Sequence, residues 1–456
     1  MFLVYAELTR LCDKRFMSFS LQTTFRATGS ASPTLALSAW LGLALTLPMI
    51  VSGLVFETYD ISTATVASEI ARQFNLPFLL AELGFVVWAW VRGMRLRALL
   101  MRLDRPALLA LALFLASFWV GGVTASPIAP FAALFNLTYI LHVCFAGALV
   151  SLAHSAKRRN LDAAVFLQVV TAALAAFVVM TAIRFSTPPP GRAIDTINWQ
   201  FAIPGFISVR LFGACVAPWA ALAAWLALTR GDCPEYRHWT FLALALSFGI
   251  VFWTATRAAI VGLGVVGLVA LWRFRLRPSV GLLARAAIAL VSGAAIATLL
   301  LPYGDPTFMF FVPADGASVD AATGGRFSLW REVWLAYQAV PWFGAGPGAT
   351  SWILPTDQFP HIQPHNLILQ FLITWGLPAT LAALYLITRA VHAAHRIADQ
   401  CREAIPYVLI ADCLLVMSFF DGIFHFAQPV MIWMAAMAVV FAVGGRAASE
   451  ETTTSP

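Results

Sequence analysis

The stretch IAPFAALFNLTYILHVCFAGALVSL, residues 128–152, decides the fold class of this chain. It runs for 25 residues without an Asp, Glu, Lys or Arg. A helix crosses the hydrocarbon core of a bilayer with about 20 mostly apolar residues. The stretch therefore predicts a transmembrane helix, and stretches of the same kind recur along the chain.

The overall composition also indicates a membrane protein. Of 456 residues, 60% are hydrophobic and 11% are charged, whereas soluble domains carry roughly 25% charged residues. So few charges cannot cover a water-facing surface, and the excess apolar surface is expected to face lipid. We predict an all-α, polytopic transmembrane helical bundle of about 12 spans. The spans are expected at 34–56, 76–91, 106–123, 128–152, 161–183, 205–228, 239–255, 257–272, 280–302, 366–390, 405–420 and 428–444.

These spans divide the chain into five parts. Residues 1–33 are expected to be a cytoplasmic or interfacial segment, and 34–302 hold the first nine spans. Residues 303–365 form one sizeable periplasmic loop with short amphipathic helices, 366–444 hold the last three spans, and 445–456 are a cytoplasmic tail. A long ordered loop in a compact protein is usually functional, which directs attention to 303–365.

The basic residues predict the orientation in the membrane. With the N-terminus in the cytoplasm, 22 of the 29 Lys and Arg residues fall in cytoplasmic segments and 7 fall outside. Cytoplasmic loops of membrane proteins carry such an excess, so both termini are expected in the cytoplasm. The net charge of +7 therefore reflects topology, and no nucleic-acid partner is expected.

The six cysteines lack the spacing of a metal site. They are scattered, and no two form a C-x-x-C pair or a zinc-finger pattern. We therefore expect neither a metal, nor another cofactor, nor a disulfide framework. The glycine-rich run at 344–348 follows no predicted strand, so we interpret it as a source of turns and not as a nucleotide-binding loop.

The stretch RFSLWREVWLAYQAV, residues 326–340, predicts a helix within the long loop. Phe327, Trp330, Trp334 and Tyr337 recur at helical spacing. We expect this amphipathic helix to lie over the outer surface of the bundle, because aromatic side chains favour the membrane interface.

Three polar residues are expected near the outer ends of spans. A neutral imidazole at His365 could accept a proton from a sugar hydroxyl; the alternative is a histidine that hydrogen-bonds a loop carbonyl. Arg257 and Arg210 lie close to hydrocarbon, where a charge is costly unless it faces an anion or the protein interior. The alternative for each is an arginine that extends to lipid phosphates. Their shared depth favours a common pocket for a diphosphate.

Three further residues carry a weaker signal. Glu82 falls within the second span, and Asp421 and His425 fall in the last outer turn. Such groups suit a pore or a proton relay. The alternative is capping of loops or helix ends, which is the interpretation favoured for Asp421.

Three segments of the second half of the chain resemble a known family. They are TATRAAIVGLGVVGL (254–268), GGRFSLWREVWLAYQAVPWFGAGPGATSW (324–352) and QPHNLILQFLITWGLPATL (363–381). They resemble three features of the bacterial O-antigen ligase / O-antigen polymerase superfamily. These are, in the same order, an arginine at the start of a span, a helix with Arg and Trp, and a His-Asn-x-x-Leu-Gln stretch. Ala255 and Ala258 stand where that family often has Ser or Gly beside the arginine, and Arg210 matches by depth and order rather than by motif.

The resemblance implies a substrate and roles for the residues. The donor would be a glycan on undecaprenyl diphosphate at the periplasmic face, and the transfer would be inverting and independent of metal. His365 would be the base, and Arg257 and Arg210 would hold the diphosphate. Arg326, Asn366, Trp330 and Gln370 would support the site or contact substrate.

The resemblance leaves several functions open. The leading hypothesis is an O-antigen ligase, a glycosyltransferase of lipopolysaccharide biosynthesis whose acceptor is the lipid A core. The alternatives within the class are a polysaccharide polymerase, whose acceptor is another lipid-linked glycan, and a protein O-oligosaccharyltransferase. From different classes, a polysaccharide transporter or flippase would need repeated halves and charges near the midplane, and a purely structural scaffold would not explain the arginines.

Overall fold

A computed structural model describes most of the chain. The described residues are 37–55, 75–94, 104–124, 129–155, 162–186, 203, 205–300, 325–354 and 363–454. The predicted segment 1–33 lies outside them, and so do 303–324 and 355–362 of the predicted outer loop.

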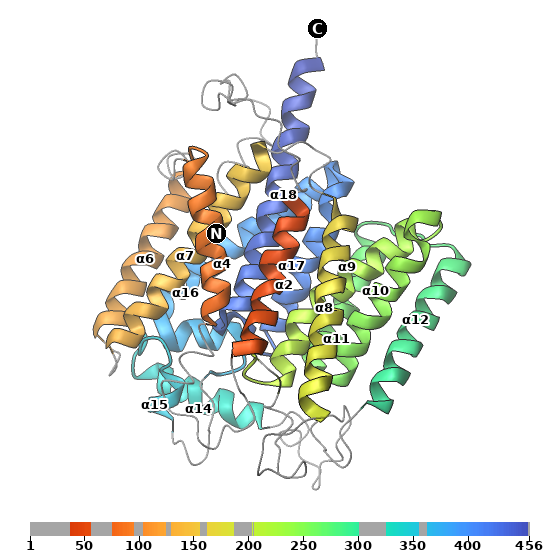
Figure 1. Cartoon of the computed structure of the whole chain (residues 1–456). Helices are drawn as coiled ribbons and strands as arrows, with labels where there is room; N and C mark the ends of the chain where they lie inside the picture. Colours follow the sequence, from red (N-terminus) through yellow and green to blue (C-terminus); the bar gives the residue numbers. More distant parts are fainter. Residues whose placement is uncertain are drawn as a thin grey trace.

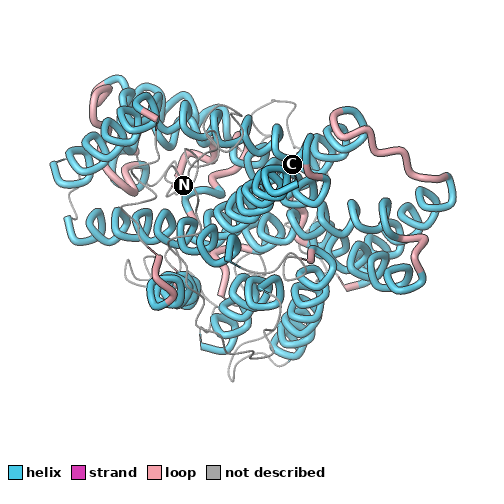
Figure 2. The backbone as a smooth tube through the Cα atoms, turned by 90° about the horizontal axis from the view of Figure 1, so that it is seen from above, coloured by secondary structure: helices cyan, strands magenta, loops and turns pink. Residues whose placement is uncertain are grey.

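The described residues are helical, as predicted. Figure 2 shows helices and loops and no strand in this part of the chain, which confirms the all-α bundle. Twelve helices lie at the positions of the twelve predicted spans (Figure 1). They are α2 (Leu37–Val55), α4 (Leu76–Val91), α6 (Arg105–Thr124), α7 (Ala129–Ser155), α8 (Ala163–Ser186), α9 (Val209–Arg230), α10 (Pro234–Trp253), α11 (Arg257–Trp272), α12 (Val280–Leu299), α16 (Leu367–Gln400), α17 (Ile405–Ser418) and α18 (Ala427–Thr454).

Some of these helices meet the length and hydropathy expected of a membrane span, and others are shorter. Seven contain a segment long and apolar enough to cross a membrane, namely α2, α7, α8, α9, α12, α16 and α18. Shorter apolar helices are α4, α6 and α11. The protein is therefore a multi-pass membrane protein, while the number of 12 spans stays a prediction.

The bundle has a buried centre and a lipid-facing edge. The apolar part of α18 is 94% buried, whereas only 28% of α12 is buried, and Figure 1 shows α18 in the middle and α12 at the side. The edge helix packs on α10 through small residues. A Cβ at Gly293 would stand 2.3 Å from the Ala245 carbonyl oxygen, so the two helices approach backbone to backbone, as helices in membranes often do.

Ion pairs collect at the end of the bundle opposite the outer loop. Each joins an arginine that the sequence assigns to the cytoplasm with an aspartate at a helix end. The pairs are Arg389–Asp104 (2.7 Å), Arg230–Asp162 (3.6 Å), Arg273–Asp399 and Arg285–Asp232. These pairs thus lie at the end of the bundle that the sequence predicts to be cytoplasmic.

A break in α16 holds the glycine-rich turn. At Gly376 the backbone has φ 76° and ψ 179°, a conformation open essentially to glycine alone. The turn docks there by backbone bonds from the Ala345 amide to the Ile373 carbonyl (2.7 Å) and from the Leu377 amide to the Pro341 carbonyl (2.8 Å). Gly344 has a φ of 69°. The run 344–348 thus supplies turns, as predicted.

Replacing Gly376 by Ala should destabilise the protein by about 2–4 kcal/mol. The new Cβ would stand 2.3 Å from the Trp342 carbonyl oxygen, and the φ of 76° would be strained as well. Thermal unfolding in detergent measures the effect. Gly264→Ala on α11 is the matched control, because a Cβ there meets nothing within 4 Å. Equal midpoints for the two variants would contradict this account of the break.

The helix predicted within the outer loop is α14 (Arg326–Gln338). It lies below the ends of the spans in Figure 1, beside the short α15 (Thr350–Ile353). Its buried face consists of Leu329, Val333 and Tyr337, which pack with Leu372 and Ile373 of α16. Phe327 and Trp334 are exposed. The aromatic series therefore does not form one face, because only Tyr337 of the series joins Leu329 and Val333 in the buried stripe.

Candidate functional site

The segment before α16 holds His365 in an unusual backbone conformation. His365 has a φ of 53°, in the left-handed region that non-glycine residues rarely adopt. On one side, the Trp330 indole N–H donates to the Pro364 carbonyl at 2.8 Å. On the other, the Asn366 side chain caps α16 by accepting from the Ile368 and Leu369 amides, and its Nδ2 donates to the Phe419 carbonyl at 3.0 Å. Neighbouring groups therefore fix the position of His365.

His365 is paired with Asp421. The Nδ1–H of the imidazole donates to Asp421 Oδ1 at 2.7 Å, and the same oxygen accepts from the Gly422 amide at 2.9 Å. Burial raises the pKa of Asp421, but the hydrogen bond and positive charge of His365, aided by Arg326, outweigh it and lower the pKa to about 2. The carboxylate thus stays ionised at neutral pH. The capping interpretation favoured for Asp421 was incomplete, because its side chain also holds the imidazole.

Arg210 and Arg257 are brought together by the contact between α9 and the α10–α11 turn. Gly213 makes the approach possible, since a Cβ there would stand 2.0 Å from Thr254 Oγ1 and 2.3 Å from Thr256 Oγ1. The Thr256 hydroxyl donates to the Arg210 carbonyl at 3.1 Å. Arg210 is half-buried in the first turn of α9, and Arg257 begins α11 with an exposed side chain.

A third guanidinium joins these two to the His365–Asp421 pair. The Arg326 Nη1 group, from the start of α14, donates to the carbonyl of Phe420, the residue before Asp421. The charge of Arg210 lies close enough to interact with Arg326, Asp421 and Arg257. His365, Arg257 and Arg210, which the sequence predicts at a common depth, thus belong to one cluster of charged residues. The cluster is built from α9, α11, α14, the start of α16 and the α17–α18 turn.

Gln370 and His425 form a buried pair next to His365. Gln370 is in the first turns of α16, and His425 ends a short 3-10 helix, η6 (Ile423–His425). Gln370 Nε2 and His425 Nδ1 are 3.2 Å apart, and both side chains are buried. Burial, and secondarily the positive charge of His365, lowers the pKa of His425 to about 4. His425 is therefore neutral at pH 7.

Glu82 belongs to a separate pair. Its two carboxylate oxygens are each 2.8 Å from His142 Nδ1, which joins α4 to α7 in the interior of the bundle. Both residues are almost completely buried. A buried charge in a membrane bundle requires such a partner. The capping alternative is therefore wrong for Glu82, because its partner is a side chain of another span.

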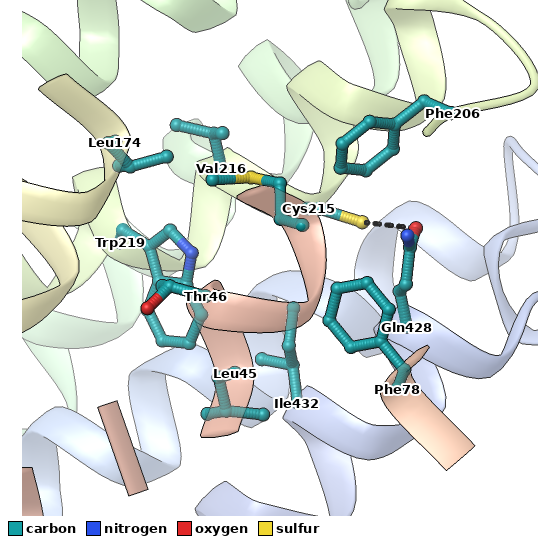
Figure 3. Close-up of a pocket in the computed structure, with 11 residues that line it drawn as sticks. Leu45, Thr46, Phe78, Leu174, Phe206, Cys215, Val216, Trp219, Gln428 and Ile432 are labelled. Carbon is teal, nitrogen blue, oxygen red and sulfur yellow. Dashed lines mark hydrogen bonds between the residues drawn. The ribbon is translucent and has the colours of Figure 1, made fainter. Parts of the chain in front are cut away.

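Figure 3 shows a small cavity deeper in the bundle. Apolar side chains such as Phe78, Phe206 and Ile432 line most of it, and Cys215 Sγ lies 3.8 Å from Gln428 Oε1 at one wall. Cys215 follows Arg210 by five residues on α9, or about 7.5 Å along the helix axis. The cavity is thus distinct from the charged cluster.

Fold and site together define a multi-pass membrane protein with an imidazole–carboxylate pair beside a cluster of guanidinium groups. A family model described as O-antigen ligase matches residues 242–384. The match includes all three segments on which the predicted resemblance rests, and it supports a likeness to the O-antigen ligase superfamily over this part of the chain. The match supports a membrane glycosyltransferase of the O-antigen ligase or polymerase type.

The match covers the cluster only in part. Arg257, Arg326 and His365 lie within 242–384, whereas Arg210 and Asp421 lie outside it. No curated protein matches the chain closely enough to serve as a relative. The roles of the individual residues therefore rest on their geometry.

Proposed function

We propose that this protein transfers a glycan from undecaprenyl diphosphate to a hydroxyl of the lipid A core. The reaction takes place at the periplasmic face of the inner membrane, and both termini are cytoplasmic. The observation that carries this proposal is the His365–Asp421 pair, at 2.7 Å, in the same cluster as three arginines. A base and a site for an anionic leaving group are the two elements that such a transfer requires.

His365 is the proposed base. Because its Nδ1–H is held by Asp421, its Nε2 carries the lone pair in the neutral imidazole. Nε2 removes the proton from the acceptor hydroxyl as its oxygen attacks C1 of the donor sugar. The ionised carboxylate of Asp421 keeps the tautomer and stabilises the imidazolium that forms, as an aspartate does beside a catalytic histidine in hydrolases.

Arg210 and Arg257 are the proposed ligands of the diphosphate, with Arg326 as a third. Guanidinium groups offer forked donors that match phosphate oxygens. Preorganised positive charge stabilises the negative charge that develops as the C1–O bond breaks. Three arginines can therefore supply what a metal ion supplies in other transferases, and the proposed reaction is independent of metal.

A direct displacement is expected to invert the configuration at C1. The acceptor oxygen attacks from the face opposite the leaving group, and one base serves this single step. The proposed site contains one imidazole–carboxylate pair and no second carboxylate in position to form a covalent intermediate among the residues described around it.

Lipopolysaccharide gels of a deletion strain test the function. Loss of a ligase removes all O-antigen bands, whereas loss of a polymerase leaves core plus one repeat unit. The purified protein should also join an undecaprenyl-diphosphate-linked glycan to lipid A core without a nucleotide. A normal band ladder in the deletion strain, together with no transfer by the purified protein, would refute the proposal.

A further inference from the structure

The polar residues around His365 change from positively charged groups at one end of the cluster to neutral groups at the other. The charge of Arg210 interacts with those of Arg257, Arg326 and Asp421. Asp421 is bonded to His365, and the charge of His365 acts in turn on His425. The cluster therefore runs from guanidinium groups, through the Asp421–His365 pair, to a neutral imidazole.

The neutral end consists of His425 and Gln370. Their side chains are 6% and 4% exposed, and the Phe135 ring packs 5.5 Å from the His425 ring. Although Gln370 Nε2 and His425 Nδ1 are in contact at 3.2 Å, Gln370 Oε1 and His425 Nε2 have no protein partner among the described residues. Buried polar atoms in native proteins are nearly always hydrogen-bonded to protein or water, so these two atoms have room for a hydrogen-bonding partner from outside the protein, a water or a ligand.

The two atoms form one donor and one acceptor. If Gln370 Nε2 donates to His425 Nδ1, the proton of His425 is on Nε2, which becomes a donor, and Gln370 Oε1 remains an acceptor. If the amide is turned over, the two roles are exchanged. In either arrangement the pair matches a hydroxyl group, which both donates and accepts.

The direction of the displacement places the acceptor at this end. In an inverting transfer the nucleophile approaches from the face opposite the leaving group. With the diphosphate at the arginines, the acceptor lies beyond His365, where His425 and Gln370 are found. We propose that His425 and Gln370 form an acceptor subsite, which binds a second hydroxyl of the acceptor beside the one that His365 deprotonates. This inference rests on the proposed function.

The subsite selects a class of acceptor. A sugar carries neighbouring hydroxyls and can satisfy His365 and the His425–Gln370 pair together. A Ser or Thr side chain of a protein carries a single hydroxyl, so either His365 or the His425–Gln370 pair is left without a hydroxyl partner. The proposed step forms the bond from the acceptor oxygen to C1 and breaks the C1–O bond to the diphosphate. The acceptor proton moves to His365, and the electron pair leaves with the diphosphate.

His425→Phe and Gln370→Met test the subsite. Both keep side-chain volume and remove the polar atoms. We expect each to raise the KM for lipid A core by about 3- to 10-fold, the effect of losing one hydrogen bond, and to leave the KM for the undecaprenyl-diphosphate-linked glycan within about twofold. Gln428→Met is the matched control, because Gln428 is also buried with an unpartnered Nε2 but lines the separate cavity.

The outcomes separate this inference from the proposed function. An unchanged KM for lipid A core in both variants overturns the subsite, and so does an equal rise in the KM values for donor and acceptor. A wild-type protein that transfers glycan to a serine-containing peptide as well as to lipid A core also overturns it. If the wild type transfers no glycan to any acceptor, the proposed function itself fails.

Discussion

His365→Ala should lower the rate of glycan transfer by about 100- to 10,000-fold, the usual contribution of a positioned general base. Without the imidazole, the acceptor hydroxyl must lose its proton to water as it attacks. The effect should appear in kcat, because His365 is not among the groups proposed to hold the diphosphate. Initial rates of transfer from an undecaprenyl-diphosphate-linked glycan to lipid A core, measured with purified protein, provide the number.

His395→Ala is the matched control for this variant. His395 also pairs with an aspartate, Asp412, at 3.0 Å, but it joins α16 to α17 near the end of the bundle opposite α14. Both variants therefore lose a histidine that pairs with an aspartate, and only His365→Ala removes the proposed base. A rate for His365→Ala within a fewfold of the control would exclude His365 as the base.

Asp421→Asn tests the His365–Asp421 pair through the pH dependence of the transfer rate. The wild-type pKa of about 2 lies below that of a free aspartate, so the carboxylate contributes stability above about pH 4 that is lost as the pH falls towards 2. Between pH 5 and 8, protonation of Asp421 should therefore cause no loss of activity. The amide variant should be slow throughout this range, because an amide cannot stabilise the imidazolium.

Most of the fold could be predicted from hydropathy alone. The stretch 128–152 became α7, and the other eleven predicted spans each correspond to a helix, because a lipid environment requires every spanning segment to satisfy its own backbone. The face that α14 buries could not be predicted in the same way. Its aromatic residues compete with Leu329 and Val333 for the contact with α16, and that contact depends on the turn docked at Gly376.

The site could be predicted where a single residue carried the signal. His365 and Arg257 stand in recognisable segments at helix ends, so topology placed them at one level. The role of Asp421 was harder to predict from the sequence, since a short Asp-Gly turn is typical of capping. Only the packing of α17 against α16 brings its side chain to His365. Trp330 likewise positions His365 through a carbonyl 34 residues away in sequence, which no local pattern encodes.

Arg257→Ala should lower kcat/KM for the lipid-linked donor by about 100- to 1,000-fold, the effect of removing one preorganised donor from a developing anion. Arg257→Lys should recover only part of this loss, because a lysine keeps the charge but lacks the planar fork. Inorganic pyrophosphate provides a second measurement. It should inhibit the wild type in competition with the donor and should inhibit Arg257→Ala far less.

Arg331→Ala is the appropriate control for charge. Arg331 is also an arginine assigned to the outer side and is exposed, on the face of α14 opposite its buried stripe, so its loss changes the net charge equally without touching the cluster. A general electrostatic attraction of the anionic lipid would affect both variants alike and would weaken as salt is added. Binding by the cluster predicts instead that Arg257→Ala alone loses pyrophosphate inhibition. Equal behaviour of the two variants would remove Arg257 from the diphosphate site.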